Sequence, residues 1–547
     1  MTTKFGLLFN HDLLLVMTEY METMDRTRFT IYLESSKIKL GSKISISQND
    51  SIRGLNKNDI EVISSLTNLK HLDLGINIKY LGYDIRKDDI DNYSMSDIAK
   101  LTDLTYLNLN NKYKITSEGL ILLAKLTNLK TLELSKNLNV FGNTNLTDFN
   151  FHIINSFLTN LTSLKFNSIQ VLDINSISNL RKIETLNVYN MIINNPEPPE
   201  SFLNLKSLKI RNPENYFLDI LGRLTNLTSL ELSWKGHIEN YNFIINLTNL
   251  EILDMTRTET NDINYLTHLT QLKDLTLSSI NNINDSTPLL FLTNLEKFAI
   301  GYLNTSNDLR YLTNLKDLDI NSSKNIKSYD LSFLTKLEKL SLIESEIDNL
   351  LGFETLRNLT DLNLSVSVIH DTNSIENLTN LKILNLSDTN FDKMDILVEL
   401  TNLESLEIND PLQHINILIK IPSLKKIAIY GSNITDNSLL EISHILTLED
   451  LTIDGVENIT DLGIKYLSRL PKLKILRIYY SDFNIKHKSL LSLPKLEELH
   501  LRINFLTFDI FKLSIPHDVL EIKQYTEYDE DTEIIYLNPA REIIPFD

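Results

Sequence analysis

The chain has 547 residues, with 53 Lys and Arg against 72 Asp and Glu, so its formal net charge is −19. This acidity makes nucleic acid and anionic membrane surfaces unfavourable partners. The sequence has no cysteine, which excludes disulfides, zinc–thiolate sites, iron–sulfur clusters and a cysteine nucleophile. A hydrophobic content of 42% with 23% charged residues is typical of a folded chain.

Residues 1–45 lack the periodicity that organises the rest of the chain. Their apolar runs, 5–9 and 13–17, are separated by Asn-His-Asp, unlike the continuous apolar core of a secretory signal. No apolar run reaches the roughly 20 residues that span a bilayer. We therefore expect an intracellular, cytoplasmic protein. Residues 9–31 are expected to form two short helices with a break near residues 22–25.

From residue 66 onward, the spacing L-x-x-L-x-x-L-x-L recurs, beginning with Leu-Thr-Asn-Leu-Lys-His-Leu-Asp-Leu at 66–74. Of the eighteen intervals between copies, thirteen are 20 to 23 residues long and eight are 22. The nineteen copies begin at Leu66, Leu101, Leu126, Leu158, Leu180, Phe202, Leu224, Leu247, Leu269, Leu292, Leu312, Leu334, Leu356, Leu378, Leu400, Ile421, Ile445, Leu470 and Leu493.

Each copy predicts one short strand with a buried face. Leu72 and Leu74 alternate with polar neighbours, the period of two that a half-buried strand requires. One such strand cannot bury its leucines alone, whereas stacked parallel copies bury them continuously, which gives a solenoid. Residues 115–125, 434–443 and 459–468 predict short helices that begin near a Thr cap. The 22-residue copies leave room only for 3₁₀ turns or extended segments.

This pattern resembles the leucine-rich repeat family over about 80% of the chain, and its L-T-N-L openings resemble the internalin-type subclass. The resemblance implies an α/β fold: a curved parallel sheet of about nineteen repeats with a small helical N-terminal segment. The longer copies with I-T-D-x-G-L wording resemble those of F-box leucine-rich proteins. The excess of Asn, Ile, Lys and Tyr resembles that of proteins from AT-rich genomes, including giant amoebal viruses, for which the expected location is the host cytoplasm.

The N-terminal segment also resembles a degenerate F-box. The residues at matching places are Leu13, Leu14, Tyr20, Met21 and Phe29, which in that family would bind a Skp-family adaptor. Asn10 stands where the family has Pro, and no Trp follows the second helix. A helical cap for the first repeat is the alternative.

We predict three regions: a helical F-box-like or capping segment at 1–45, the solenoid at 46–522, and an acidic tail or cap at 523–547. Residues 518–522 are a candidate final strand. The longest intervals contain extra chain at 83–100 and 138–155, which is expected to bulge from the convex side or the rim.

Signatures of catalysis are missing. The sequence has no phosphate-binding Walker loop, no His-Glu-x-x-His and no Gly-x-Ser-x-Gly. Paired carboxylates such as Asp317 and Asp319 flank a strand leucine, where they are expected to face solvent. We therefore predict a protein that is not an enzyme and that has no cofactor and no metal site.

Recognition of a protein on the concave face of the sheet is the function that remains. Aromatic and Arg side chains are the usual binding anchors, and they gather in the C-terminal repeats. The predicted contact residues are Lys426, Tyr430, Arg477, Tyr479, Tyr480, His500 and Arg502. An acidic middle zone around Trp234, Asp254 and Asp319 is the alternative surface. Asn137, Asn190 and Asn390 are expected to bond backbone between coils.

Two functions stay open at this stage. One is a substrate adaptor of a cullin-type ubiquitin ligase, with the F-box-like segment holding a Skp-family protein and the repeats holding the target. The other is a plain repeat scaffold whose N-terminus only caps the core.

Overall fold

The computed structural model describes most of the repeat region. The described residues are 43–45, 60, 63–64, 66–74, 91–110, 115, 117–135, 154–167, 172–188, 191–192, 199–211, 215–233, 236–237, 241–256, 258–259, 262–277, 283, 285–373, 375–409, 415–431, 434–455, 459–479, 493–502, 520–527 and 530–537. The chain divides into two compact units. The N-terminal unit comprises Met1–Lys235 and Asn240–Leu250, and the C-terminal unit comprises Gly236–Glu239 and Glu251–Asp547.

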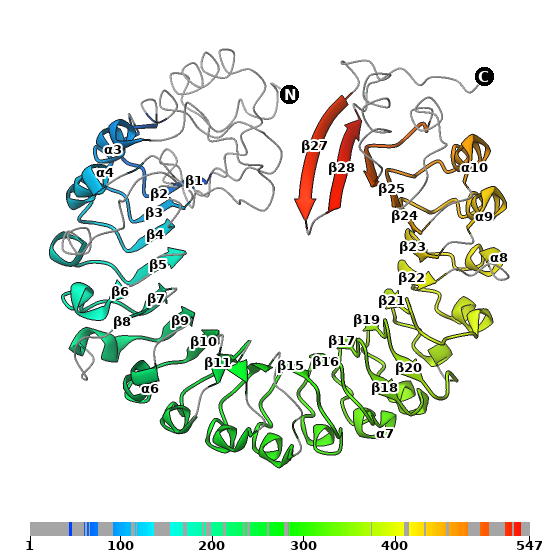
Figure 1. Ribbon diagram of the computed structural model, residues 1–547, viewed down its shortest axis with the longest axis horizontal. Coiled ribbons are helices and arrows are strands. Elements are labelled where there is room, and N and C mark those ends of the chain that lie inside the picture. Colours follow the sequence, from blue (N-terminus) through cyan, green and yellow to red (C-terminus); the bar gives the residue numbers. More distant parts are fainter. Residues whose placement is uncertain are drawn as a thin grey trace. The chain divides into compact units, whose positions relative to one another are not determined.

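In the N-terminal unit, one strand from each repeat joins a parallel sheet in chain order (Figure 1). Its strands are β1 (Lys43–Ser45), β2 (His71–Asp73), β3 (Tyr106–Leu109), β4 (Thr131–Ser135), β5 (Ser163–Asn167), β7 (Thr185–Val188), β9 (Ser207–Arg211) and β10 (Ser229–Ser233). The returning segments are α3 (Asn92–Ile98), α4 (Ser117–Ile121), η2 (Leu122–Lys125), η3 (Ile174–Ile177), η4 (Glu200–Asn204), α6 (Asn215–Leu221) and η5 (Asn242–Asn246). A second short ladder joins β6 (Leu172–Asp173) to β8 (Met191–Ile192).

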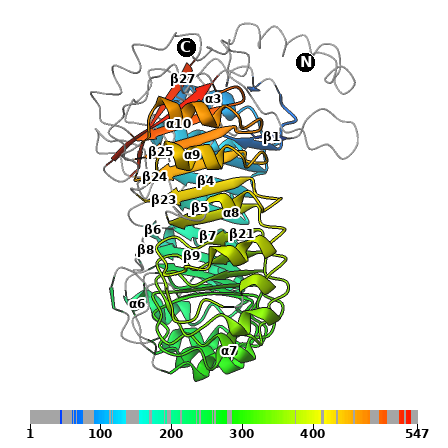
Figure 2. The ribbon, with the colours of Figure 1, turned by 90° about the vertical axis from the view of Figure 1, so that its right-hand side faces the viewer.

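The C-terminal unit repeats this arrangement. Its parallel strands are β12 (Ile252–Asp254), β14 (Asp274–Leu277), β15 (Lys297–Gly301), β16 (Asp317–Asn321), β17 (Lys339–Ser341), β19 (Asp361–Asn363), β21 (Ile383–Asn385), β22 (Ser405–Asn409), β23 (Lys426–Tyr430), β24 (Asp450–Asp454), β25 (Ile475–Tyr479) and β26 (Glu498–Arg502). Figure 2 shows several of these strands stacked in chain order beside the helices that follow them. Short ladders join β11 (Gly236–His237) to β13 (Thr258–Glu259) and β18 (Glu346–Ile347) to β20 (Val368–Ile369).

The returning segments of the C-terminal unit change in kind along the chain. The repeats of about 22 residues use mainly 3₁₀ turns: η6 (Asn264–His268), η7 (Thr287–Phe291), η8 (Leu309–Tyr311), η9 (Leu351–Thr355), η10 (Ile375–Asn377) and η11 (Met394–Glu399). The α-helices are α7 (Ser328–Leu331), α8 (Ile415–Leu418), α9 (Asp436–Ile442) and α10 (Asp461–Leu467). The helices predicted at 434–443 and 459–468 are confirmed as α9 and α10. The helix predicted at 115–125 is confirmed as α4, which continues into the 3₁₀ turn η2. Thr435 and Thr460 are the N-caps of α9 and α10.

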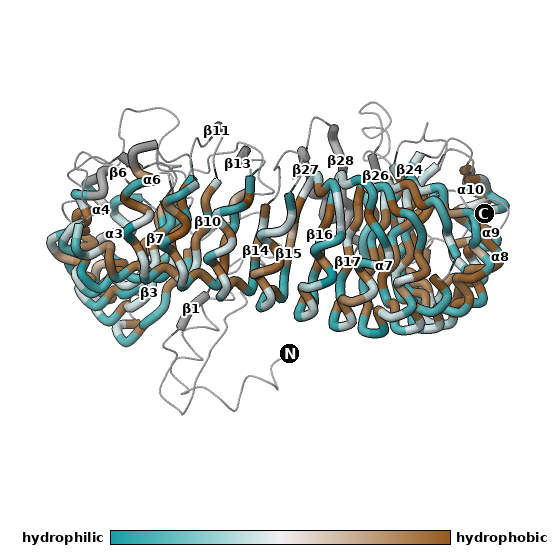
Figure 3. The backbone as a smooth tube through the Cα atoms, turned by 90° about the horizontal axis from the view of Figure 1, so that it is seen from below, coloured by the Kyte–Doolittle hydropathy of each residue, from teal (hydrophilic) through white to brown (hydrophobic). Residues whose placement is uncertain are grey.

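Leucines at equivalent repeat positions form the core. Leu318, Leu340 and Leu362 lie in register on consecutive strands and are at most 1% exposed. Their neighbours Asp317 and Asp319 lie on the other face of the strand, as predicted. Oδ1 of Asp319 is nevertheless buried, so this side chain does not fully face solvent as expected. Figure 3 shows the hydrophobic stretches recurring from coil to coil. Each buried leucine contributes about 2 kcal/mol of hydrophobic free energy, so stability grows with the number of stacked coils.

The asparagine of the L-T-N-L opening bonds each coil to the coil before it. Its Nδ2 donates to a backbone carbonyl 21 to 33 residues upstream, as from Asn314 to Thr293 at 2.9 Å. The asparagines with this bond are Asn128, Asn160, Asn204, Asn226, Asn249, Asn294, Asn314, Asn358, Asn380 and Asn402. Asn390 also bonds backbone between coils, through Ile369, as predicted. Asn137 and Asn190 lie outside the described residues.

Part of the extra chain at 83–100 departs from the prediction of a bulge. Residues 92–98 form the regular helix α3, which packs beside α4. Asp91 caps this helix by accepting bonds from the N–H groups of Tyr93 and Ser94. The cap and the buried Met95 and Ile98 give the segment the same helix–strand unit as its neighbours. Residues 138–153 lie outside the described part of the chain.

A left-handed residue follows the strand in five successive coils. These residues are Tyr302, Ser322, Glu344, Val366 and Asp388, with φ between 52° and 60°. The conformation turns the N–H group toward the next coil, and that of Val366 donates to the carbonyl of Ser387 at 2.8 Å. Non-glycine residues pay a steric cost here, which is largest for a β-branched side chain.

An antiparallel hairpin follows the last parallel strand. β27 (Leu520–Glu527) pairs with β28 (Glu530–Leu537), and β28 pairs antiparallel with β26. The sequence predicted a strand at 518–522 and left residues 523–547 as either an acidic tail or a cap, without the antiparallel pairing. The reversal was missed because charge runs usually lie in solvated loops.

A candidate binding surface on the strands of the C-terminal unit

The open face of the sheet is the face turned away from the leucine core. Parallel strands in register place equivalent repeat positions next to one another. Arg477 therefore lies beside His500, and Tyr479 lies beside the backbone of Arg502. Tyr430 lies beside Asp454, which in turn lies beside Tyr479. We refer to Lys426, Tyr430, Arg477, Tyr479 and His500 as the C-terminal patch.

Two predicted patch residues are not fully placed. Tyr480 lies outside the described residues, and only the backbone of Arg502 is described. The described members come from the strands β23, β25 and β26, and β24 lies between β23 and β25. The structure therefore brings the described side chains onto one stretch of the open face, while their role in binding stays a prediction.

Glu407 anchors the first side of the patch. Its Oε2 accepts hydrogen bonds from the Asn385 amide at 2.9 Å and the Tyr430 hydroxyl at 3.4 Å. The Lys426 ammonium lies 3.9 Å from its Oε1. Burial and the neighbouring Glu407 charge raise the pKa of Tyr430 to about 12, so the phenol stays neutral and remains a hydrogen-bond donor at physiological pH.

Carboxylates also contact Arg477 and His500 on the other side of the patch. The Arg477 guanidinium forms an ion pair with Asp450 and lies 3.5 Å from the Thr452 hydroxyl. His500 Nε2 lies 3.2 Å from Glu498. Burial, reinforced by the nearby Arg477 charge, lowers the pKa of His500 below its usual value. His500 is therefore neutral near pH 7. Tyr430, Lys426, Arg477 and His500 each lie within contact distance of a carboxylate.

The acidic middle zone is only partly acidic. In the row that precedes the first strand leucine, carboxylates alternate with lysines in register: Asp274, Lys297, Asp317, Lys339 and Asp361. The next row contains Asp254 and Asp319. Burial raises the pKa of Asp319, and its Oδ1 has no hydrogen-bond partner among the described residues. Trp234, the other marker of this zone, lies outside the described residues.

A further polar cluster on the open face of the N-terminal unit was not singled out from the sequence. Glu133 accepts hydrogen bonds from the Tyr106 hydroxyl at 3.2 Å, the Asn110 amide at 3.3 Å and the Lys165 ammonium at 2.8 Å. The His71 ring stacks on Tyr106 with centroids 3.9 Å apart. Burial and adjacent carboxylates raise the pKa of Tyr106. Reading aligned rows for adjacent opposite charges, rather than for Arg and Tyr alone, would have found it.

The F-box-like residues are not placed, and the described residues contain neither a metal-ligand cluster nor a helix suited to span a membrane. Leu13, Leu14, Tyr20, Met21 and Phe29 lie outside the described residues. Within the described residues, no group of three or more His, Asp or Glu side chains is arranged to hold a metal ion. None of the helices described has the length and apolar character required to cross a bilayer.

Comparison with known proteins gives structural matches only. No protein-family model and no curated protein matches the chain. An internalin of Listeria monocytogenes aligns at 22% identity and a TM-score of 0.44, covering 67% of this chain and 94% of its own. A leucine-rich-repeat protein of Leptospira interrogans aligns at 19% identity and a TM-score of 0.48, covering 72% of this chain and 100% of its own.

A third solved structure is the functional domain of InlJ from Listeria monocytogenes, which aligns at 19% identity and a TM-score of 0.41. It covers 81% of this chain and 82% of its own length. The fold itself is evident in the coils of this chain, through one parallel strand per repeat, leucines stacked in register and short helices or 3₁₀ turns between strands. The chain has the fold of a leucine-rich-repeat solenoid.

Proposed function

We propose that the protein is a non-enzymatic recognition module that binds a protein partner through the C-terminal patch. The observation that carries this proposal is the set of carboxylates that hold the patch side chains. Glu407 receives Tyr430, Asp450 receives Arg477, and Glu498 receives His500. Side chains held in one geometry lose less conformational freedom on binding, which favours affinity.

The patch also has the composition of a binding centre. Tyr and Arg are enriched among the residues that dominate the binding energy of characterised interfaces. Both occur here, on β23 and β25, with Asp454 of β24 between the two tyrosines. Because the ion pairs neutralise the local charge, a partner with both polar and apolar character fits this surface better than a polyanion.

Tyr479→Ala tests this proposal without removing a strand leucine. Wild-type and variant chains are compared for melting temperature and for captured partners by quantitative mass spectrometry. A matched control is Ser365→Ala, which changes the equivalent position of the repeat, one residue after the second strand leucine Leu364, several coils away. The proposal requires that melting is preserved and that a partner retained by the control is lost by Tyr479→Ala. Equal capture by all three chains would move the site elsewhere.

A narrower version of the proposal makes the chain a cytoplasmic adaptor of a cullin-type ubiquitin ligase. Its support is the F-box-like spacing of Leu13, Leu14, Tyr20, Met21 and Phe29 in the sequence. The alternative is a plain repeat scaffold whose N-terminus caps the first coil. Deletion of residues 1–40 separates the two, because the adaptor requires binding of a purified Skp-family protein at micromolar concentration that the deletion abolishes.

A further inference from the structure

A row of alternating charges runs along the C-terminal unit at one position of the repeat. This rim row contains the residue directly after the L-T-N-L opening, at the edge where each strand begins. Its members are Glu251, Lys273, Glu296, Lys316, Glu338, Thr360, Lys382, Glu404, Lys425, Glu449, Lys474 and Glu497. Glutamate and lysine alternate at every step except at Thr360.

Four of the five lysines of the rim row pair with the glutamate one coil earlier. The Nζ–O distances are 2.8 Å for Lys273–Glu251, 2.7 Å for Lys316–Glu296, 2.8 Å for Lys425–Glu404 and 3.1 Å for Lys474–Glu449. These hydrogen bonds raise the pKa of the lysines Lys273, Lys316 and Lys425. In all four pairs, the lysine belongs to the later coil and the glutamate to the earlier one.

Thr360 stands where this pattern requires the lysine for Glu338. The Thr360 hydroxyl is too short to replace an ammonium and donates instead to the backbone carbonyl of Glu338 at 3.2 Å. Among the described residues, no hydrogen bond or ion pair reaches the Glu338 carboxylate. The ammonium of Lys382, one coil beyond Thr360, likewise has neither, since Glu404 receives its bond from Lys425.

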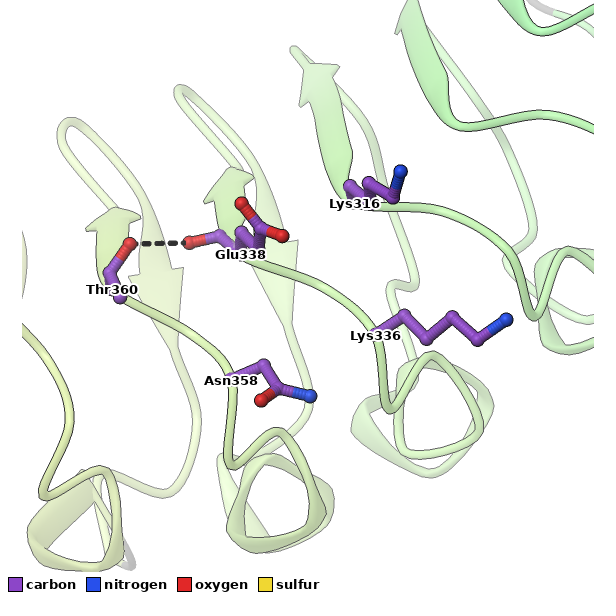
Figure 4. Close-up of a pocket in the computed structure, with 5 residues that line it drawn as sticks. All are labelled: Lys316, Lys336, Glu338, Asn358 and Thr360. Carbon is purple, nitrogen blue, oxygen red and sulfur yellow. Dashed lines mark hydrogen bonds between the residues drawn. The ribbon is translucent and has the colours of Figure 1, made fainter.

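A pocket of about 380 Å³ occupies this gap (Figure 4). It is lined by Lys316, Lys336, Glu338, Asn358 and Thr360. The lysines of the lining are engaged elsewhere, since Lys316 bonds Glu296 and Lys336 bonds the amide oxygen of Asn314 at 2.7 Å. Figure 4 shows the Lys336 side chain extending away from Glu338. The carboxylate of Glu338 acts electrostatically on Lys316, but it is the charge of this lining that receives neither a hydrogen bond nor an ion pair from the described residues.

We propose that this notch binds a lysine or arginine side chain of a partner protein, which takes the place of the missing rim lysine and pairs with Glu338. The Lys382 ammonium then forms an ion pair with a carboxylate of the same partner. Two strand spacings of about 4.8 Å separate residues 338 and 382, so the partner's two charges are roughly 10 Å apart. A basic side chain is the expected occupant because its charge complements Glu338 and because a lysine occupies the same place in the four intact pairs of the row. The notch lies outside the C-terminal patch.

Selection of peptides from a phage-displayed random dodecapeptide library tests this site on the full chain. Because the net charge of −19 attracts basic peptides in general, the readout is the difference between variants. Thr360→Lys supplies the missing lysine partner of Glu338 and fills the notch with the chain's own ammonium. Lys and Arg enrichment is expected to fall about fivefold relative to wild type, the ratio that one exposed ion pair supports.

Three further variants complete the design. Glu338→Lys should replace Lys and Arg enrichment with Asp and Glu enrichment. Thr360→Val leaves the notch open and should retain the wild-type selection. Thr270→Lys adds the same charge at an exposed position four coils earlier and should also retain it. Equal enrichment on Thr360→Lys and wild type, or an equal loss on Thr270→Lys, would overturn the proposal. Thermal melting verifies that all variants are folded.

Discussion

The carboxylate of Asp436 in α9 lies against the backbone of Gly463 in α10. Its Oδ1 accepts hydrogen bonds from the N–H groups of Gly463 at 3.0 Å and Thr460 at 2.8 Å, and its Oδ2 accepts the Thr460 hydroxyl at 2.6 Å. One coil thus caps the helix of the next. A Cβ on residue 463 would lie 2.4 Å from Oδ1, which explains a glycine within the helix. In the N-terminal unit, a Cβ on Gly119 would likewise lie 2.5 Å from Oδ1 of Asn92.

Gly463→Ala is expected to destabilise the chain by about 1–2 kcal/mol, because the Asp436 carboxylate must rotate away and lose its bonds. Gly352→Ala should cost more, since its Cβ would lie 2.2 Å from the backbone oxygen of Ser328, which cannot rotate away. Denaturant unfolding measures both. Asp436→Ala should remove the part of the cost of Gly463→Ala that comes from the carboxylate, whereas the contact of the new Cβ with Leu439 Cδ1 at 2.9 Å remains. Strictly additive effects would contradict the coupling between residues 436 and 463.

Val366→Gly is expected to stabilise the chain by about 1 kcal/mol. Val366 is half exposed and has φ of 60°, so glycine removes a steric cost of about 1–2 kcal/mol from the folded state. Part of this gain is lost because glycine increases the conformational entropy of the unfolded chain. Val368→Gly is the matched control in the extended strand β20, where only the entropic loss applies. A rise in melting temperature for the first variant and a fall for the second is the expected pair of results.

Asp319→Asn is expected to stabilise the chain at neutral pH. Burial raises the pKa of Asp319 above that of the unfolded chain, so the folded state holds this proton more tightly. Its contribution is therefore most favourable at acid pH and is lost as pH rises through the folded pKa. Melting curves from pH 3.5 to 7 should show the variant gaining on wild type with rising pH. An unchanged difference across this range would be inconsistent with a desolvated carboxylate.

His500 should give stability the opposite acid response. Because its pKa is lowered in the folded chain, the unfolded state takes up the proton first. Stability therefore falls as pH decreases below the ordinary histidine value of about 6.5. His500→Gln should remove this part of the pH dependence, which melting curves between pH 5 and 7.5 measure. Nuclear magnetic resonance titration of the ring checks the cause directly, and a pKa above 6.5 would refute it.

The repeat period accounts for most of what the sequence could predict. Strand positions, buried leucines and the Thr-capped helices follow from local spacing, because each coil contacts mainly its neighbours. Asp317 and Asp319 were placed on the open face by simple alternation. Helix α3 was missed because its residues lie in a long interval, where only the Asp91 cap and the spacing of Met95 and Ile98 mark a helix.

Pairing between coils was harder to predict than placement within a coil. Arg477 and Tyr430 were recognised as candidate anchors, whereas their carboxylate partners Asp450 and Glu407 were not. These contacts run diagonally between neighbouring strands and depend on side-chain reach. The gap at Thr360 has the same origin, since a missing partner becomes visible only when the intact pairs of the rim row are known.

The hairpin of β27 and β28 restricts where further repeats can be added to the sheet. Stacking of parallel coils does not itself limit their number, because the last coil presents the same leucines and the same unpaired strand edge to any coil that follows it. β28 occupies the edge of β26 and runs in the opposite direction, so a further coil finds no matching register there. Duplicated repeats can therefore be accommodated before β26, and the evolutionary record of expansion in this unit should lie in its interior coils.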